Sequence, residues 1–478
     1  MTPHAAFEVL NRAAGIAPLA APKFEGAHHE NRLQPFSAPF RFPTAAAAAL
    51  GFAAAAAAEI WRFRGGDRQS ISVDLKSAAV SLAAHTIVRL NGSLLPEPKD
   101  GTATTGFYQT NDRRWLYLRG GFPHLARRTL DLLNARDEPP AVTAAVAKWN
   151  GVALENALAF MGLTGSLVRS REEWQTLAVP PQPPIGLRKV GDAPPFRPAA
   201  HAMPLGDLRV LDLTRLTAGA AATATLASHG AQVLRVVSPR LPDPAEYAFG
   251  AGKRVTELDL KKPGDAEVLR HLVREAQVFV DAYRPGALAG LGFSPASLAH
   301  IAPGLITVSL SAYYGPWAPQ RGFEDVVQAA TGMAAEQGSF LAAQRGKPRE
   351  ILPALVSAPV LSVLTGYLAA AGVAAALLRR IREGGSWHVD VSLAATAAWL
   401  LTLGRIDAVA DALTPRDGLD PYLYSCETRD GWFELLGPVV RLDKTPPVKG
   451  ALPDGFVSPH WASVHEEANA AEKQPAQT

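Results

Sequence analysis

The stretch that decides the fold is PLGDLRVLDLTRLTAGAAATATLASHGAQVLRVVSP at 204–239, followed by AGKRVTELDLKK at 251–262. It begins with a short apolar run at Val210 to Leu213. Small helix-forming residues follow from Ala218 to Ala227, and a second β-rich run extends from Ala231 to Val237. A strand, a helix and a second strand in this order predict one βαβ unit, whose strands are parallel.

The residues around this unit indicate which nucleotide it suits. A dinucleotide enzyme has a G-x-G-x-x-G turn after the first strand and an acidic residue after the second, which holds the ribose hydroxyls. Here the turn Thr214 to Gly219 contains a single glycine, and it also contains Arg215. The second strand contains Arg235, and Lys253 and Arg254 follow it. Cations in these places favour a phosphate-bearing nucleotide over NAD.

Length, charge and cysteine content narrow the class of protein. A chain of 478 residues is too long for one ordinary core, so two or three domains are expected. The 47 basic and 44 acidic residues nearly balance, which gives no reason to expect nucleic acid or an anionic membrane as partner. The single Cys426 and the absence of a signal-peptide pattern predict a cytoplasmic protein. No cluster has metal-ligand spacing, so no metal site is predicted.

An alanine-rich run at Thr44 to Trp61 is better explained as a buried helix than as a membrane span, because alanine drives insertion only weakly. This run belongs to the segment 44–75, which can be aligned with the segment 365–393. Each has an alanine-rich helix, a basic turn with Gly-Gly, and a strand that ends in VDL or VSL. A second pair of similar segments, 106–118 and 422–436, reads as two hairpins. The helix alone would resemble any other alanine-rich helix, but the turn and the hairpin favour an internal repeat.

These patterns predict an α/β fold with a doubly wound, mainly parallel sheet, a smaller α+β domain and an internal repeat. The proline-rich stretch PPQPPIGLRKVGDAPPFRPAAHAMP has no apolar period and predicts an extended linker. The predicted segments are a degenerate repeat of the large-domain helix and strand (1–100), a small α+β domain (101–179), the linker (180–203), a nucleotide-binding-type domain (204–400), a hairpin segment like the small domain (401–450) and a tail that is disordered at its end (451–478).

Six segments stand in order between Pro204 and Leu400: RVLDLTRLTAG, LASHGAQVLRV, GKRVTELDLK, VFVDAYRPGALAGLGF (278–293), GLITVSLSAYYGPWAPQRGFEDVVQAATG (304–332) and TGYLAAAGVAAALLRRIREGGSWHVDVSL (365–393). Together they resemble the family III CoA-transferases, also called the CaiB/BaiF type. Because several segments match in order, the resemblance is more specific than any single motif. It implies a large and a small domain in interlocked protomers, and here a fused, partly degenerate double unit that is either a homodimer or a self-closed pseudo-dimer.

The resemblance implies that coenzyme A or an acyl-CoA is a substrate, that a small carboxylic acid is the other partner, and that no cofactor is covalently bound. CoA carries a pyrophosphate and a 3′-phosphate, so its site needs cations and backbone N–H groups. A solvated surface charge is the alternative reading of each single cation. The residues that match the family's binding segments are Arg215, Arg235, Lys253, Arg254, Tyr283 and Arg284, with the ring of Tyr283 placed to cover the adenine or the pantetheine.

Family members use an aspartate in a D-x-x-T-G pattern, whose carboxylate takes the acyl group as a mixed anhydride. The matching position here is Ser362, and in the first copy it is Arg41. Ser362 either is acylated, which would need a base that the adjacent sequence lacks, or fills the space of the missing group. Glu324 is the other catalytic candidate, and its alternative reading is a favourable charge at a helix N-terminus.

The sequence thus predicts a CoA-transferase-like enzyme that moves CoA between an acyl-CoA and a carboxylic acid through an enzyme-bound acyl intermediate. The alternative is a catalytically impaired pseudoenzyme or partner subunit that binds CoA or acyl-CoA, and it rests on Ser362 and Arg41. An acyl-CoA racemase is less favoured, because Phe323 stands where the related racemases have a histidine.

Overall fold

The structure is a computed structural model that describes residues 1–33, 35–96, 102–177, 180–239, 247–347, 352–407 and 422–462. The end of the expected tail and residues 408–421 of the expected hairpin segment lie outside the described residues.

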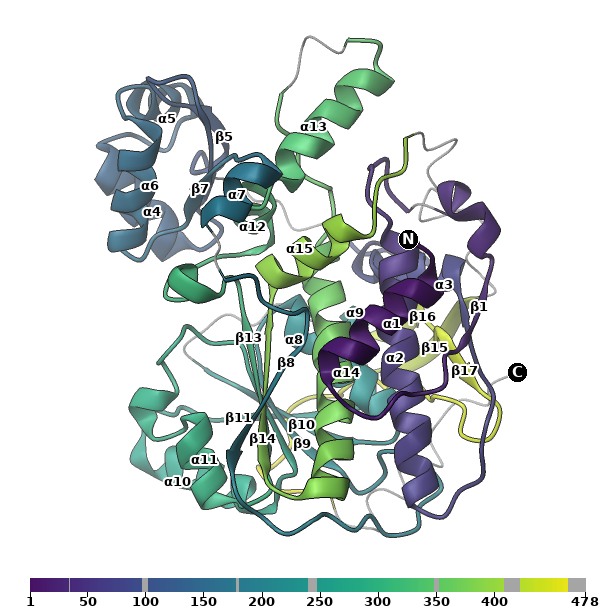
Figure 1. The fold of residues 1–478 in the computed structure, drawn as a ribbon. Helices are drawn as coiled ribbons and strands as arrows, with labels where there is room; N and C mark the ends of the chain where they lie inside the picture. Colours follow the sequence, from purple (N-terminus) through teal and green to yellow (C-terminus); the bar gives the residue numbers. More distant parts are fainter. Residues whose placement is uncertain are drawn as a thin grey trace.

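A seven-stranded sheet forms the centre of the molecule, in the order β11-β10-β9-β12-β13-β14-β8 (Figure 1). Neighbouring strands from β11 to β14 are parallel, and β8 is antiparallel to β14 at the edge. This arrangement confirms the predicted doubly wound, mainly parallel sheet. The strands are β8 (Gly186–Gly191), β9 (Arg209–Leu213), β10 (Gln232–Val237), β11 (Lys253–Glu257), β12 (Val278–Asp281), β13 (Ile306–Ser311) and β14 (Ser386–Ser392).

Helices cover both faces of this sheet, because successive strand residues point to opposite sides and both sides are apolar. Val210 and Val278 pack in one core with α8 and α14, whereas Leu211 and Phe279 pack in a second core with α10 and α11. The crossover helices follow the predicted alternation of strands and helices. Their bounds are α8 (Thr217–Ser228), α9 (Tyr247–Gly250), α10 (Pro263–Glu275), α11 (Pro295–Ile301), α12 (Glu324–Ala330), α13 (Met333–Gln344), α14 (Val360–Glu383) and α15 (Leu393–Thr402).

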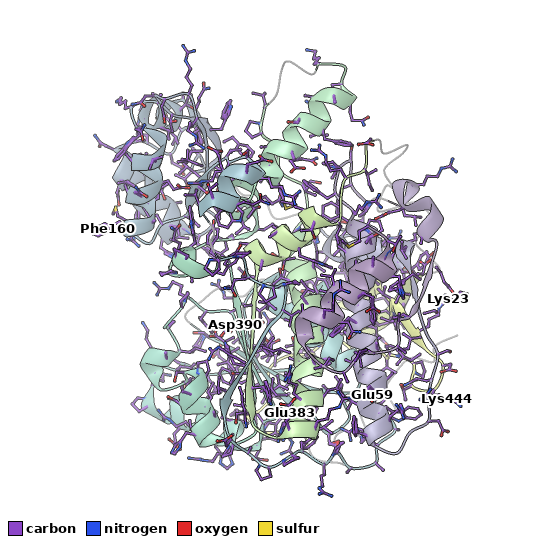
Figure 2. All side chains as sticks on the ribbon, in the orientation of Figure 1. Lys23, Glu59, Phe160, Glu383, Asp390 and Lys444 are labelled. Atoms are coloured by element: carbon purple, nitrogen blue, oxygen red, sulfur yellow. The ribbon has the colours of Figure 1, made fainter. Side chains whose placement is uncertain are left out.

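The two long alanine-rich helices, α2 (Phe42–Phe63) and α14, lie side by side (Figure 1). Both are long and apolar enough to span a membrane, but 89% and 94% of their most apolar windows are buried inside the protein. Near their ends Arg382 of α14 forms an ion pair of 3.5 Å with Glu59 of α2. Figure 2 labels Glu59 and Glu383 on the corresponding ends of the two helices. The run predicted to be a buried helix is therefore a core helix in this structure.

The segments of the expected repeat form the same succession of elements. In the first copy α2 leads through a Gly-Gly turn to β2 (Ile71–Asp74) and α3 (Leu75–Ser81), and in the second α14 leads to β14 and α15. The second pair of segments forms antiparallel hairpins, β5 with β6 and β15 with β16. A duplication as the origin of this likeness stays a prediction.

Two of the expected boundaries differ from the structure. The expected linker 180–203 contains β8, which pairs with β14 and forms an edge strand of the large sheet. The reason is that Leu187 packs against the main core, an apolar contact that the proline-rich composition obscured. The segments 1–100 and 401–450 are not separate units either, since β3 pairs with β16 and β2 pairs with β17. The remaining elements of these two segments are α1 (Pro3–Ala14), β1 (Lys23–Glu25), β3 (Arg89–Leu90), β4 (Ser93–Leu94), β15 (Leu423–Thr428), β16 (Gly431–Leu436) and β17 (Val440–Leu442).

The small α+β unit has its own core, in which Leu116 and Leu118 of its sheet pack against helices that cover one face. It stands apart from the large sheet in Figure 1, and Figure 2 shows Phe160 at its outer edge, where this side chain is 93% exposed. The backbone N–H of Arg169 donates to the carbonyl of Ala329 in α12 and so ties the unit to the large domain. Its elements are β5 (Thr105–Gln109), β6 (Trp115–Arg119), α4 (Pro123–Leu133), α5 (Pro139–Val146), α6 (Gly151–Phe160), β7 (Gly165–Leu167) and α7 (Arg171–Leu177).

Candidate active site

A cavity of about 610 Å³ lies at the carboxyl ends of the parallel strands. Its walls include the residues that follow β9, β10, β11, β12 and β13, because parallel strands end at the same edge of a sheet. Phe122 and His124 of the small unit and the segment 320–323 form the opposite wall. Ligands of doubly wound folds bind in this position, outside the carboxyl ends of the strands.

Positive charge dominates this cavity. Among the described residues that line it, Asp259 is the one carboxylate, and the cations are Arg215, Lys261, Arg284 and Arg321. Burial lowers the pKa of Arg321, and the nearby guanidinium groups of Arg284 and Arg128 lower it further. Like charges held together in this way favour an anionic ligand, which would relieve their repulsion.

His124 shares this positive environment. Burial lowers its pKa below the ordinary value, and four nearby arginines, of which Arg321 contributes most, lower it further. The imidazole is therefore neutral at neutral pH, so it can donate or accept a hydrogen bond in the cavity.

Aromatic contacts join the small unit to the large domain at this site. The guanidinium carbon of Arg215 lies 5.0 Å from the ring centre of Phe122, and the rings of Phe122 and Phe323 are 5.7 Å apart. Leu216, next to Arg215, has φ 93° and ψ 172°, a backbone region that is essentially restricted to glycine. The turn after β9 is thus held in a strained conformation at the cavity wall.

Three of the six residues predicted to bind CoA lie in this cavity: Arg215, Tyr283 and Arg284. Tyr283 follows the end of β12, where its backbone N–H donates to Asp281 at 2.7 Å. Burial raises the pKa of Asp281 to about 6. The predicted turn after β12 is therefore a wall of the site.

Arg235, Lys253 and Arg254 are not among the residues that line the cavity, so a role for them in binding CoA stays a prediction. Lys253 begins β11, and its side chain reaches β9 and the first turn of α8 without lining the cavity. Its Nζ is buried, donates to the carbonyl of Ala220 and lies 3.4 Å from Asp212 Oδ2. Arg235 is buried within β10, and Arg254 donates to the carbonyl of His460 at the surface.

Sequence reasoning missed four residues of the site: Lys261, Arg321, Phe122 and His124. Lys261 belongs to the quoted stretch VTELDLKK and comes after β11, so the position of the strand end was the signal that could have identified it. Arg321 precedes the GFED segment that supplied Glu324 as a candidate. Phe122 and His124 belong to the small unit, and nothing in their local sequence places them beside the large sheet.

The two catalytic candidates, Glu324 and Ser362, are in contact although they are 38 residues apart. Glu324 Oε2 accepts hydrogen bonds from the Ser362 backbone N–H at 2.6 Å and from Ser362 Oγ at 2.7 Å. Its Oε1 accepts from the backbone N–H of Leu361 at 2.8 Å and from Gln328 Nε2 at 3.0 Å. The N–H groups of Leu361 and Ser362 belong to the first turn of α14, where backbone N–H groups have no acceptor within the helix. The Glu324 carboxylate accepts from them and so caps this helix.

Burial raises the pKa of Glu324 to about 7, although the four hydrogen bonds act in the opposite direction. A carboxyl with this pKa exchanges its proton near neutral pH, as an acid, base or nucleophile of an active site must. Phe323, the preceding residue, lines the cavity, so Glu324 and Ser362 lie directly behind this wall.

The first copy has a related arrangement at the start of α2. Glu30 accepts a hydrogen bond from the Thr44 backbone N–H at 3.2 Å, and it also forms an ion pair with Arg41, the residue that aligns with Ser362. A glutamate therefore caps the long helix in both copies. Only in the first copy does an arginine neutralise it, as far as the described residues show.

Comparisons with known proteins agree with these features. The model of "CoA-transferase family III" matches residues 205–438. An acyl-CoA transferase of Gibberella moniliformis is 33% identical over 269 residues, which cover 52% of this chain and 46% of that protein. A succinate–glutarate CoA-transferase of Agrobacterium fabrum is 29% identical over 212 residues, which cover 40% of this chain and 51% of that protein.

A crystal structure of Rv3272 from Mycobacterium tuberculosis is 31% identical and covers 42% of this chain and 56% of that one, with a TM-score of 0.38. The chain spans about half the length of the curated relatives it matches. Residues 205–438 contain the strands whose ends form the cavity, together with both Glu324 and Ser362. Through these residues the chain is similar to members of CoA-transferase family III.

Proposed function

We propose that this protein moves CoA from an acyl-CoA to a small carboxylic acid through an enzyme-bound acyl intermediate. The observation that supports this best is the cavity at the strand ends, where four cations surround a space of about 610 Å³. The phosphates of CoA supply the negative charge that such a site attracts. The names of the relatives, among them the succinate–glutarate CoA-transferase, support the same class of reaction.

The test is an exchange assay. A panel of acyl-CoAs is incubated with isotopically labelled carboxylic acids, and newly formed labelled acyl-CoA is measured by mass spectrometry. Exchange with at least one pair of substrates is the expected result. CoA binding without exchange for any pair would leave only a binding protein and contradict the enzyme.

Arg284→Ala is expected to weaken CoA binding about 10- to 100-fold, because one charge-assisted hydrogen bond contributes about 1.5–3 kcal/mol. Arg284 is exposed in the cavity and is therefore available to a ligand. Isothermal titration calorimetry with CoA measures the change. The matched control is Arg254→Ala, since Arg254 is a cation of the same family segments that lies outside the cavity. Equal losses in both variants would show that CoA does not use this cavity.

We further infer that the chain is a self-closed pseudo-dimer and not a homodimer, since α2 of the first copy already packs along α14 of the second within one chain. Light scattering at micromolar concentration should then give the mass of one chain, 50.6 kDa. Twice that mass would favour the homodimer. A cytoplasmic location also stays a prediction, with which the buried, unpaired Cys426 is compatible.

A further inference from the structure

We propose that Glu324 is the residue that carries first the acyl group and then CoA, and that Ser362 positions it. This inference rests on the proposed CoA transfer. The family pattern indicates the position of Ser362 for the nucleophile. The proposal assigns this role to Glu324, whose carboxylate is hydrogen-bonded to Ser362.

A CoA transfer in which the enzyme carries first the acyl group and then CoA requires a carboxyl group on the enzyme. After the acyl group has been taken up, the CoA thiolate must be held on an enzyme carbonyl carbon while the first acid leaves. A serine hydroxyl has no such carbon. A serine ester also cannot be opened by the acceptor carboxylate, because an alkoxide is a far poorer leaving group than the carboxylate that attacks it. Ser362 could therefore support hydrolysis or acyl transfer, but not CoA transfer.

The structure places a carboxylate at this point. Glu324 Oε2 lies 2.7 Å from Ser362 Oγ, so it occupies the neighbourhood of the side chain that the family pattern makes an aspartate. In the described part of the chain, no lysine or arginine nitrogen is found within 4 Å of Glu324. The carboxylate is thus oriented by hydrogen bonds and is not neutralised by an ion pair.

The donors around Glu324 suit the tetrahedral intermediates of this reaction. When a thiolate or carboxylate attacks the glutamyl carbon, negative charge develops on a side-chain oxygen. The backbone N–H groups of Leu361 and Ser362 already point at these oxygens, from the N-terminus of a 24-residue helix. Preorganised donors of this kind stabilise an oxyanion without reorganisation during the reaction.

Glu324 directly follows a segment that lines the cavity. The preceding residue, Phe323, lines the cavity, and so does Arg321 three residues earlier. Both Glu324 and Ser362 retain partial solvent exposure. The phosphates of CoA can therefore occupy the cationic region while its thioester end reaches the start of α14.

Glu30 in the first copy of the repeat corresponds to Glu324, but it is not expected to act as a second nucleophile. Glu30 caps α2 as Glu324 caps α14, but its carboxylate is paired with Arg41. An ion-paired carboxylate is a weaker nucleophile, because its negative charge is shared with the guanidinium. The member without an arginine partner among the described residues is Glu324, whose neighbour Phe323 lines the cavity.

The reaction balances without any further reagent. An oxygen of the Glu324 carboxylate attacks the thioester carbon, the C–S bond breaks, and CoA leaves as thiolate from a mixed anhydride. The thiolate attacks the glutamyl carbon and releases the donor acid as carboxylate, which leaves a glutamyl–CoA thioester. The acceptor carboxylate displaces the thiolate to form a second anhydride. The thiolate then attacks the acceptor's acyl carbon and regenerates Glu324.

The experiment is chemical trapping on the full chain. The protein is mixed with an acyl-CoA that supports exchange and is treated with sodium borohydride, which reduces an activated carboxyl to an alcohol, and the peptides are mapped by mass spectrometry. The expected result is reduction at Glu324. Glu324→Gln should lower exchange about 1,000-fold or more, with the Kd for CoA changed less than about threefold.

Two further variants separate the roles. Ser362→Ala removes one hydrogen bond and leaves the carboxylate, so exchange should fall only about 10-fold and reduction should still occur at Glu324. Glu30→Gln is the matched control, because it changes the corresponding carboxylate of the first copy, and it should leave exchange and labelling intact. An acyl group mapped to Ser362, or full exchange by Glu324→Gln, would overturn the assignment and leave the proposed function standing. Absence of exchange in the unaltered protein would instead overturn the function itself.

Discussion

Lys253→Met is expected to lower the free energy of unfolding by about 3–5 kcal/mol, because it leaves a buried carboxylate without its counter-charge. The Lys253 side chain is 1% exposed and that of Asp212 is 0% exposed, and their charged atoms are 3.4 Å apart. Asp212 also accepts hydrogen bonds from Thr214 and Thr223, which fix it but do not neutralise it. Equilibrium unfolding in urea measures the loss.

The neighbouring Arg254 provides the control for this change. Arg254→Met removes a half-buried cation of the same strand that pairs with no buried carboxylate in the described residues, and its effect should stay within about 0.5 kcal/mol. The double variant Lys253→Met with Asp212→Asn should recover part of the loss, since no charge then remains buried. A loss below about 1 kcal/mol in Lys253→Met alone would show that the pair is not desolvated as described. Loss of CoA affinity in a stably folded Lys253→Met would restore the predicted binding role.

The rate of CoA exchange is expected to rise with pH through an apparent pKa of about 7 and to fall about 50-fold from pH 7 to pH 5. Burial raises the pKa of Glu324 to about 7, and only the ionised carboxylate can attack the thioester. Each pH unit well below this value lowers the ionised fraction about tenfold. Initial rates at saturating substrate across pH 5 to 8.5 give the profile.

Protonation of Glu324 does not lower the activity at acid pH by unfolding the protein, because it stabilises the folded state. The folded-state pKa lies above the ordinary glutamate value of 4.5, so the folded protein binds this proton more tightly than the unfolded chain does. Protonation of Glu324 therefore adds stability as the pH falls from about 7 towards 4.5. Activity and this contribution to stability change in opposite directions.

His124 is the other cavity group that titrates in the range, and its pKa lies below the ordinary value of 6.5. His124→Gln should keep the limb near pH 7, since it leaves Glu324 unchanged. Asp281, with a pKa of about 6, is hydrogen-bonded to the turn of Tyr283 and also borders the site. A profile that is flat between pH 5 and 8 would contradict a role for the Glu324 carboxylate in the reaction.

The order of elements in the large domain could be predicted from the sequence, and the reason is that it depends on local patterns. The run Val210 to Leu213, the small residues after it and the second β-rich run form β9, α8 and β10. The alanine-rich segments form α2 and α14, the two long helices of the core. Periodicity and propensity act over a few residues, so they are visible in the chain before any tertiary contact is known.

The positions of the candidate CoA-binding cations relative to the cavity could be predicted only in part. Arg215 and Arg284 follow the carboxyl ends of their strands and reach the cavity, whereas Lys253 stands at the amino end of β11 and is buried. The sequence identified all three as cations near strands. Whether such a side chain faces the cavity or a buried carboxylate such as Asp212 depends on tertiary packing, which local patterns do not define.

By itself, therefore, the sequence determined the α/β class, the family of residues 205–438 and a set of candidate residues that included both Glu324 and Ser362. Only the tertiary structure decided that these two side chains meet at the start of α14, and that Phe122 and His124 of the small unit complete the cavity. The physical reason is that hydrophobic periodicity is a property of neighbouring residues. Contact between groups 38 or more residues apart depends on how whole elements pack, which no local pattern encodes.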